Sequence, residues 1–184
     1  MKLDTFSSAG FDRGSSRTAE AAWLVLSGLL VASWLPGSGW RVRLLRAFGA
    51  QVGTGVVLKP GVRIKFPWRL RIGDHSWVGE DVWIDNLGEV TVADHVCISQ
   101  GAYLCTGNHN WSRETFDLVV QSITVETGAW IGAKSIVGPG TRIQEGVVLT
   151  AGSVANGTLD CYTIYRGNKA VAVGQRRIAP ATSD

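Results

Sequence analysis

A chain of 184 residues is long enough to bury one sizeable core, and this length is typical of a single domain. Its net charge is small, because Lys and Arg exceed Asp and Glu by 18 − 15 = 3, so the dense basic surface of a nucleic-acid-binding protein is not expected. The three cysteines, Cys97, Cys105 and Cys161, are odd in number and form no C-x-x-C pair. This argues against a disulfide framework or a cysteine-ligated zinc site and predicts buried thiols in a reducing cytoplasm.

Residues 1–48 are predicted to form an N-terminal helical segment. The charges of the first twenty residues do not follow the order of a signal peptide, so no export signal is expected. The apolar run 21–35 is shorter than the roughly 20 apolar residues of a membrane-spanning helix. One or two helices are therefore expected over 21–48, with a break at Leu35-Pro36-Gly37.

Tryptophans and arginines gather in this segment: Trp23, Trp34, Trp40, Arg41, Arg43 and Arg46. Indole rings beside cations are typical of a bilayer interface, where the rings lie among the headgroups and the cations meet anionic lipid. Peripheral contact with the inner face of the plasma membrane is therefore one interpretation of the segment.

From residue 49 to residue 165 the sequence repeats with a period of six. Aliphatic residues occupy every sixth position in the later part: Val125, Ile131, Val137, Ile143 and Leu149. The same phase appears earlier in three blocks separated by two-residue insertions: Val52, Leu58 and Ile64, then Ile72, Val78 and Ile84, then Val92, Ile98 and Leu104. A small or polar residue follows most of them, and such residues allow tight corners.

A period of six fits neither an α-helix nor an alternating strand. It predicts an all-β solenoid in which three short strands complete a coil of about 18 residues and each aliphatic residue points inward. Burial of each such side chain stabilises the fold by roughly 1.5–3 kcal/mol. Because the open end of a solenoid needs a cover, we favour a cap as the role of residues 1–48, a role that is compatible with membrane contact.

The largest break in the repeat predicts an extruded loop over about residues 107–123. Leu104 and Val125 are 21 residues apart, three more than one coil of 18, and the sequence between them has no six-residue pattern. Insertions between the coils of a solenoid project from its surface and often carry the binding function.

His109 leaves the repeat within this loop and is the predicted catalytic base. An unperturbed imidazole titrates near about pH 6.5, so its neutral form can accept a proton from a hydroxyl group. His75 and His95 lie in the matching strings Gly73-Asp74-His75-Ser76 and Ala93-Asp94-His95-Val96 and are expected to be solvent-facing turn residues. The histidines are 20 and 14 residues apart, without the close pair of the similar gamma-class carbonic anhydrases, so no metal site is predicted.

Over about residues 36–170 the sequence resembles the hexapeptide-repeat acetyltransferases, and most of all their colanic-acid-biosynthesis group. Three stretches carry the resemblance: Trp83-Ile84-Asp85-Asn86-Leu87, the run from Cys97 that ends in Thr106-Gly107-Asn108-His109, and Gly128-Ala129-Trp130-Ile131-Gly132-Ala133. It implies a left-handed parallel β-helix, acetyl-coenzyme A as co-substrate, and homotrimers with active sites between subunits. His109 matches the catalytic base of the similar maltose and galactoside acetyltransferases.

The resemblance also implies a coenzyme groove along the later coils. Ala133 and Ala151, 18 residues apart, match positions that touch the pantetheine arm. The predicted coenzyme-binding residues are Trp130, Ala133, Lys134, Ala151, Gly152, Arg166 and Lys169. Two departures concern the phosphates: no cation follows Gly152-Ser153 closely, and the usual Gly-Asn-Pro-Ala turn is Gly167-Asn168-Lys169-Ala170. The expected substitutes are Lys134, Arg166, Lys169, Arg176 and Arg177, although ordinary solvated charges fit them equally well.

The predicted function is transfer of acetyl from acetyl-coenzyme A to a sugar hydroxyl, in the biosynthesis of an exopolysaccharide or another surface glycan. His109 would remove the hydroxyl proton while backbone amides stabilise the oxyanion, without a covalent enzyme intermediate. Carboxylates bind sugar hydroxyls and indoles cover apolar sugar faces, so the acceptor, free or lipid-linked, is expected at five residues. These are Asp85, Asn86, Asn108, Trp111 and Glu114, for which a structural role at a corner or loop is the alternative.

Two other functions stay open at this point. The chain could be an N-acyltransferase that acts on an amino sugar or amino acid, or a non-catalytic solenoid that binds a partner. Residues 166–184 show no motif beyond the cations named above and are predicted to form a C-terminal tail.

Overall fold

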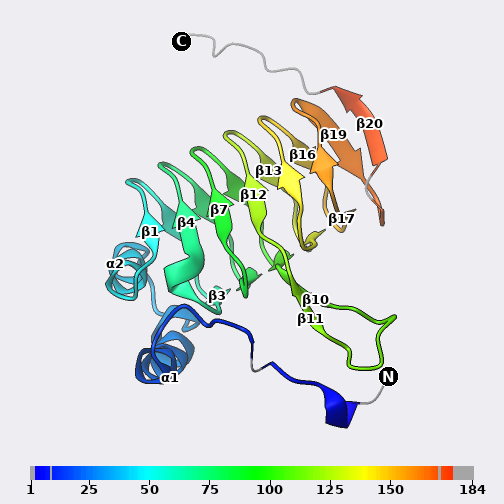
Figure 1. The fold of residues 1–184 in the computed structure, drawn as a ribbon. Coiled ribbons are helices and arrows are strands. Elements are labelled where there is room, and N and C mark those ends of the chain that lie inside the picture. The colour runs from blue at the N-terminus through cyan, green and yellow to red at the C-terminus, as the bar shows by residue number, and fades with distance from the viewer. Residues whose placement is uncertain (1–2, 9, 170, 176–184) are drawn as a thin grey trace.

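The structure, a computed structural model, describes residues 3–8, 10–169 and 171–175. Short strands wind into a three-sided prism whose coils stack along one axis (Figure 1). Each face of the prism is a sheet in which the strands of successive coils pair in parallel. The predicted left-handed parallel β-helix is confirmed.

The strands of each face follow one another along the prism axis. Face A consists of β1 (Gln51–Val52), β4 (Leu70–Ile72), β7 (Val90–Val92), β12 (Ile123–Val125), β15 (Arg142–Ile143) and β18 (Thr158–Leu159). Face B consists of β2 (Val57–Leu58), β5 (Trp77–Val78), β8 (Cys97–Ile98), β13 (Trp130–Ile131), β16 (Val148–Leu149), β19 (Thr163–Arg166) and β20 (Val171–Gln175). Face C consists of β3 (Arg63–Ile64), β6 (Trp83–Asp85), β9 (Tyr103–Cys105), β14 (Ile136–Val137) and β17 (Val154–Ala155).

The core of the prism consists of the aliphatic residues that mark the repeat. Val92, Leu104 and Ile131 are at most 2 % exposed. In the parallel ladder of face A, Val52 pairs with Ile72, and Ile72 pairs with Val92. This stacking fixes the register of the coils, because a shift of one residue would turn every inward side chain outward.

The coils differ in length, and one prediction about them is wrong. Equivalent positions on face A lie 20 residues apart in the first coils, 33 apart from Val92 to Val125, and 18 apart from Val125 to Ile143. Leu104 lies on face C and Val125 on the adjacent face A, so the interval between them is not one coil plus three residues. It is a single corner with a long insertion, and the residue that pairs with Leu104 in the next coil is Val137.

The predicted burial of the thiols is also wrong. All three cysteines are free; Cys97 and Cys105 are half-buried and Cys161 is exposed. Cys97 and Cys105 are neighbours of the inward residues Ile98 and Leu104, and because side chains alternate along a strand they point outward.

Helices cover the N-terminal end of the prism. They are α1 (Arg17–Leu26), a π-helix that continues it over Ser27–Val31, and α2 (Gly39–Ala47), while short 3-10 helices span Leu3–Thr5 and Pro67–Arg69. Trp23 and Leu45 belong to the same buried cluster as the inward residues of the first coil, and the Trp23 indole N–H donates to the Ile64 carbonyl at 2.9 Å. These contacts support the cap interpretation of residues 1–48. Within the described residues no helix has the length and apolarity that a membrane crossing requires.

Arg41 organises the turn between the helices, which includes the predicted break. Its side chain is fully buried and donates hydrogen bonds of 2.6–3.0 Å to the carbonyls of Val31, Ser33, Leu35 and Gly37. Burial lowers the pKa of the Arg41 guanidinium, and the four carbonyl groups replace water as its partners. Arg41 therefore does not meet lipid, as the membrane interpretation expected, but holds the turn in place.

The C-terminal strand departs from the predicted tail. β20 folds back and pairs antiparallel with β19, with Arg166 opposite Val171, and so closes face B. Residues 170 and 176–184 of the tail lie outside the described residues, and with them Arg176 and Arg177, two of the predicted phosphate-binding cations. The division of the chain into residues 1–48, 49–165 and 166–184 stays a prediction.

Replacement of Ile131 by Asp should unfold the prism or lower its free energy of unfolding by more than about 4 kcal/mol, because it buries an unpaired carboxylate. Ile131 is 0 % exposed, whereas Ile136, one strand later, is 40 % exposed, so Ile136→Asp is a matched control with a cost of less than about 1 kcal/mol. Denaturant unfolding followed by circular dichroism measures both. Equal losses in the two variants would contradict the assignment of inward and outward positions.

Candidate active site

His109 lies on a β-hairpin that leaves the corner between faces C and A. Strands β10 (Gly107–His109) and β11 (Leu118–Val120) pair antiparallel, with His109 opposite Leu118. The insertion predicted as a loop is therefore ordered by backbone pairing, and it projects from the side of the prism (Figure 1). The pairing gives the His109 side chain a fixed position outside the hydrophobic core.

The hydrogen bond of the His109 ring determines its tautomer. The ring nitrogen Nδ1 lies 2.8 Å from the carbonyl oxygen of Phe116, and a carbonyl oxygen can only accept a hydrogen bond. Nδ1 therefore carries the proton, and in the neutral ring Nε2 has the free lone pair that a general base needs. The Phe116 ring stacks on the imidazole, with 4.1 Å between centroids and 3° between planes, which further fixes its orientation.

A second aromatic ring, Phe6, reaches His109 from the N-terminal segment. The two ring centroids are 5.5 Å apart in an edge-on arrangement. Figure 1 shows this segment passing beside the hairpin before it enters α1. Farther along, Phe11 stacks on Phe66 at 6.4 Å, and the Trp68 indole N–H donates to the Arg13 carbonyl at 2.8 Å, which ties the segment to the prism. Sequence analysis missed Phe6 and Phe116, since neither lies in the repeat.

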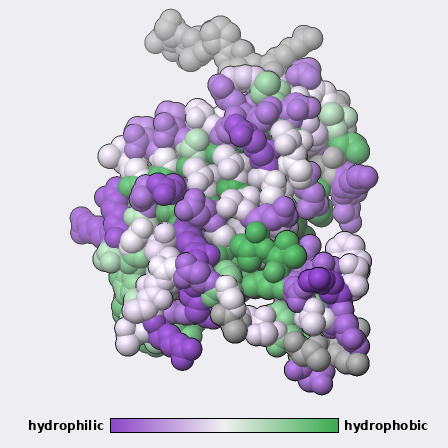
Figure 2. Space-filling view, viewed as in Figure 1, coloured by the Kyte–Doolittle hydropathy of each residue, from purple (hydrophilic) through white to green (hydrophobic). Residues whose placement is uncertain are grey.

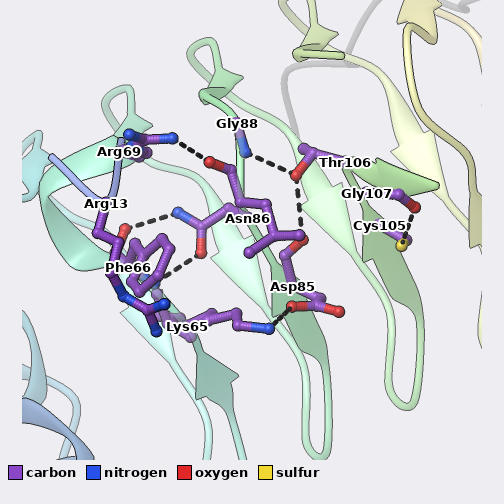
Figure 3. Close-up of polar contacts among 12 residues, drawn as sticks. Arg13, Lys65, Phe66, Arg69, Asp85, Asn86, Gly88, Cys105, Thr106 and Gly107 are labelled. Carbon is purple, nitrogen blue, oxygen red and sulfur yellow. Dashed lines mark hydrogen bonds and ion pairs between the residues drawn. The ribbon is translucent and has the colours of Figure 1, made fainter. Parts of the chain in front are cut away.

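Asp85 lies at the centre of a polar cluster on the outer side of face C. The Lys65 ammonium is 3.1 Å from Asp85 Oδ1, and the Tyr103 hydroxyl donates to Asp85 Oδ2 at 3.2 Å (Figure 3 draws the Lys65 contact). Oδ1 is buried and accepts no well-directed hydrogen bond among the described residues, so the Lys65 contact is an ion pair. Burial raises the pKa of the Tyr103 phenol, with further contributions from Cys105 and Asp85, so Tyr103 stays protonated and acts as a donor.

The cluster borders a groove between the helical segment and face C. The groove has a volume of about 310 Å³, and its walls include Leu24, Gly28, Arg63, Trp83 and Asp85. The Arg63 guanidinium lies 4.6 Å above the Trp83 ring. An indole, a carboxylate and cations in one groove suit a ligand with both apolar faces and hydroxyl groups, as sugars have.

Asn86 does not take the predicted acceptor role. Its side chain is 0 % exposed; its Oδ1 accepts from the Phe66 backbone N–H at 3.0 Å, and its Nδ2 donates to the Phe66 carbonyl at 2.6 Å (Figure 3). Both ends of the amide are thus occupied by the preceding coil. The alternative interpretation of Asn86 as a structural corner is the one that this geometry favours.

The other predicted acceptor residues lie on the hairpin. Asn108 is exposed on β10, and its Oδ1 accepts from the His109 backbone N–H at 2.8 Å. Trp111, 79 % exposed, and Glu114, also exposed, lie near the tip between β10 and β11. The structure thus separates the acceptor candidates into Asp85 on face C and a hairpin group beside or beyond His109.

The structure brings most of the predicted coenzyme-binding residues to one edge of the prism. Ala133 and Lys134 lie at the corner between faces B and C, and in the next coil Ala151 and Gly152 occupy the same corner, where the Gly152 N–H donates to the Ala133 carbonyl at 2.8 Å. Beyond them Lys169 follows Asn168, which bridges to Val154 in parallel. Lys134 and Lys169 are exposed, so two cations flank a corner of small residues.

Trp130 and Arg166 flank this edge on face B. Trp130 is 48 % exposed and its indole N–H donates to the Ser99 hydroxyl at 2.9 Å. Arg166 is exposed at the end of β19. All seven predicted coenzyme residues therefore lie on the later coils, but on a different edge from the corner that carries His109.

His75 and His95 lie at turns, as predicted. Both have a left-handed backbone, with φ of 56° and 57°, and their rings stack at 5.3 Å. In the part of the chain that the structure describes, no group of three or more His, Cys, Asp or Glu residues is arranged to hold a metal ion.

Similarity to a known protein identifies the family, although no family model matches the chain. Over 169 residues the chain is 37 % identical to "Putative colanic acid biosynthesis acetyltransferase WcaF" of Escherichia coli (strain K12), and the match covers 91 % of this chain and 92 % of that protein. The chain belongs to this acetyltransferase family. The enzyme is also 27 % identical over 117 residues to galactoside O-acetyltransferase of Escherichia coli, covering 62 % of this chain and 58 % of that one.

A solved structure has the same fold as this acetyltransferase. It is a hexapeptide-repeat acetyltransferase of Vibrio cholerae in complex with acetyl-coenzyme A, with a TM-score of 0.82 and 23 % identity. The match covers 91 % of this chain and 93 % of that one. At this level of identity the similarity shows the fold alone.

Replacement of Asn86 by Ala should lower the free energy of unfolding by about 2–4 kcal/mol, because it leaves the buried N–H and C=O of Phe66 without partners. The folded fraction of the variant should keep a normal KM for its acceptor. Asp85→Asn is the paired variant, for which we expect a raised acceptor KM and a smaller loss of stability. Denaturation and steady-state kinetics on both variants test the assignment, which a raised KM in Asn86→Ala with unchanged stability would contradict.

Proposed function

We propose that this acetyltransferase transfers an acetyl group from acetyl-coenzyme A to a sugar hydroxyl, with His109 as the general base. The observation that carries the proposal is the bond between His109 Nδ1 and the Phe116 carbonyl, which leaves Nε2 basic on a hairpin outside the core. The relatives support the substrates: one is a galactoside O-acetyltransferase, one is named for colanic acid biosynthesis, and a solved structure contains acetyl-coenzyme A.

The reaction follows from this geometry. Nε2 of His109 takes the proton of a sugar hydroxyl as its oxygen attacks the thioester carbonyl, and the carbonyl electrons move to the oxygen. Collapse of the tetrahedral intermediate breaks the carbon–sulfur bond, and the proton from His109 goes to the departing thiolate. Phe116 and Phe6 keep the ring in one orientation through both proton transfers. General-base catalysis of this kind contributes about 10²–10⁴ in rate.

The coenzyme is proposed to lie along the edge that carries Ala133, Ala151 and Gly152. Small side chains let a pantetheine arm approach the backbone closely, and Lys134 and Lys169 at the same edge suit the phosphates. Arg166 supplies a third cation, and Trp130 is an exposed ring on the adjoining face B. These assignments replace the cation and proline that the resemblance implied but that the sequence lacks.

The acceptor is proposed to contact Asp85 in the groove of face C, with Asn108, Trp111 and Glu114 contributing from the hairpin. Asp85 lines this groove, where Lys65 and Tyr103 hold its carboxylate in place, and a carboxylate accepts hydrogen bonds from sugar hydroxyls. A surface glycan under construction, such as an exopolysaccharide, is the proposed acceptor class.

A homotrimer is proposed because, within one chain, His109 and the edge proposed to bind the coenzyme lie at different corners of the prism. His109 lies at the corner between faces C and A, whereas Ala133 and Ala151 lie at the corner between faces B and C. A neighbouring prism can bring its coenzyme edge to this hairpin. Figure 2 shows hydrophobic surface at the base of the hairpin among hydrophilic side chains, and a contiguous apolar area is a common mark of a subunit contact.

The cytoplasm, at the inner face of the plasma membrane, is the proposed location. Three free cysteines, one of them exposed, fit a reducing compartment.

His109→Ala should keep its fold and its affinity for acetyl-coenzyme A but lose about 10²–10⁴ in kcat, because the base is absent while the groove is intact. Thiol release from acetyl-coenzyme A is measured against a panel of sugars, nucleotide sugars and lipid-linked glycans. His75→Ala, a histidine at an exposed turn, is the control and should retain full turnover. Near-normal turnover by His109→Ala would eliminate the assignment, and failure of every acceptor with the wild-type enzyme would count against a sugar substrate.

A further inference from the structure

Large hydrophobic side chains are exposed along the helical cap. Leu24, Val25, Leu29, Trp34 and Leu35 are 73 %, 58 %, 69 %, 73 % and 54 % exposed. We call these five residues the helical patch. Single exposed apolar residues are ordinary, but five within twelve positions mark an interaction surface.

The patch has an ordered geometry. Leu24, Val25 and Leu29 lie on α1 and the π-helix and are exposed, whereas Trp23 of the same helix is 2 % exposed and packs into the prism. Trp34 and Leu35 lie in the turn that Arg41 holds through the carbonyls of Ser33 and Leu35, at 2.6 and 2.7 Å. Arg41 also donates to the carbonyl of Val31 at the end of the π-helix, at 3.0 Å, so it holds the turn against the end of the helix.

Charge is distributed unevenly between this end of the molecule and the rest. No charged residue occurs between Glu20 and Arg41, so the patch itself is uncharged. Residues 1–70, which include the cap and the first coil, contain ten Lys and Arg and three Asp and Glu, or 10 − 3 = +7; residues 71–184 contain 8 − 12 = −4. Exposed cations adjoin the patch at Leu24, which shares one groove with Arg63, Lys65 and Asp85 and another with Arg17, Lys65 and Glu20, so cations outnumber carboxylates in both.

We propose that the helical patch docks this enzyme on the surface of an anionic bilayer. An uncharged apolar helix face at the basic end of the molecule is the pattern of a helix that lies in the plane of the membrane interface. Its apolar side chains enter the headgroup boundary, the Trp34 ring lies among the headgroups, and the adjoining cations meet lipid phosphates. The helical stretch Arg17–Val31 is 10 + 5 residues long, too short to cross a bilayer but sufficient to lie on one.

Docking in this way would also place the proposed acceptor groove next to the membrane surface. The groove that contains Asp85 has Leu24 in its wall, so the groove opens beside the patch. A docked enzyme would hold this groove at the level of the headgroups. The docking surface itself does not depend on the proposed chemistry, and its test needs no measurement of activity.

Vesicle flotation of the full-length protein tests the proposal, with vesicles of phosphatidylcholine alone and with about a third phosphatidylglycerol. The wild type should float with the anionic vesicles and much less with the neutral ones, and added salt should weaken binding. The double variant Leu29→Ser, Trp34→Ser should bind the anionic vesicles at least about tenfold less, because it removes two inserted side chains. Trp77→Ser, which removes a ring 58 % exposed on face B, is the matched control and should bind as the wild type does.

Circular dichroism checks that the double variant is folded, which we expect because both replaced side chains are exposed. Measurement of its mass in solution checks the oligomeric state. Absence of wild-type binding, equal binding to the two kinds of vesicle, or unchanged binding of the double variant would each overturn the proposal. A fall in oligomeric mass in the double variant, without vesicle binding by the wild type, would assign the patch to contact between copies of this chain instead.

Discussion

The inward ladder of aliphatic residues is the constraint on which the rest of the structure depends. Each face of the prism stacks its inward residues from coil to coil, as Val52, Ile72 and Val92 do on face A. This ladder buries the core and pairs the backbone at the same time, so a coil cannot shift without exposing apolar side chains and breaking hydrogen bonds. Any insertion must therefore leave at a corner, which is why the hairpin that carries His109 can be long and ordered without disturbing the coils on either side.

The proposed function depends on the residues at two corners of the prism. One corner extends into the hairpin, where backbone pairing and two aromatic rings orient His109 with Nε2 free. Another corner stacks Ala133 on Ala151 and Gly152 beside exposed lysines. The prism holds these two corners apart within one chain, and this separation is the physical reason for the proposal that the reaction takes place between subunits.

The sequence predicted the fold well because a six-residue period has only one simple solution: three strands per coil. It also predicted that His109 lies on an insertion and that His75 and His95 lie at turns. It did not predict that Asn86 is buried, because an asparagine at a corner has the same sequence pattern whether its amide faces solvent or bridges a backbone. Phe6 and Phe116 were missed for a different reason, since the contacts of an N-terminal segment with a distant hairpin have no periodic signal.

A crystal structure of the enzyme with coenzyme A bound is the most direct test of the proposed active site. We expect a trimer in which the coenzyme lies along the edge of Ala133 and Ala151 of one chain. Its sulfur should lie about 3–5 Å from His109 Nε2 of a neighbouring chain. A coenzyme bound elsewhere, or a sulfur more than about 10 Å from every His109 ring, would contradict it.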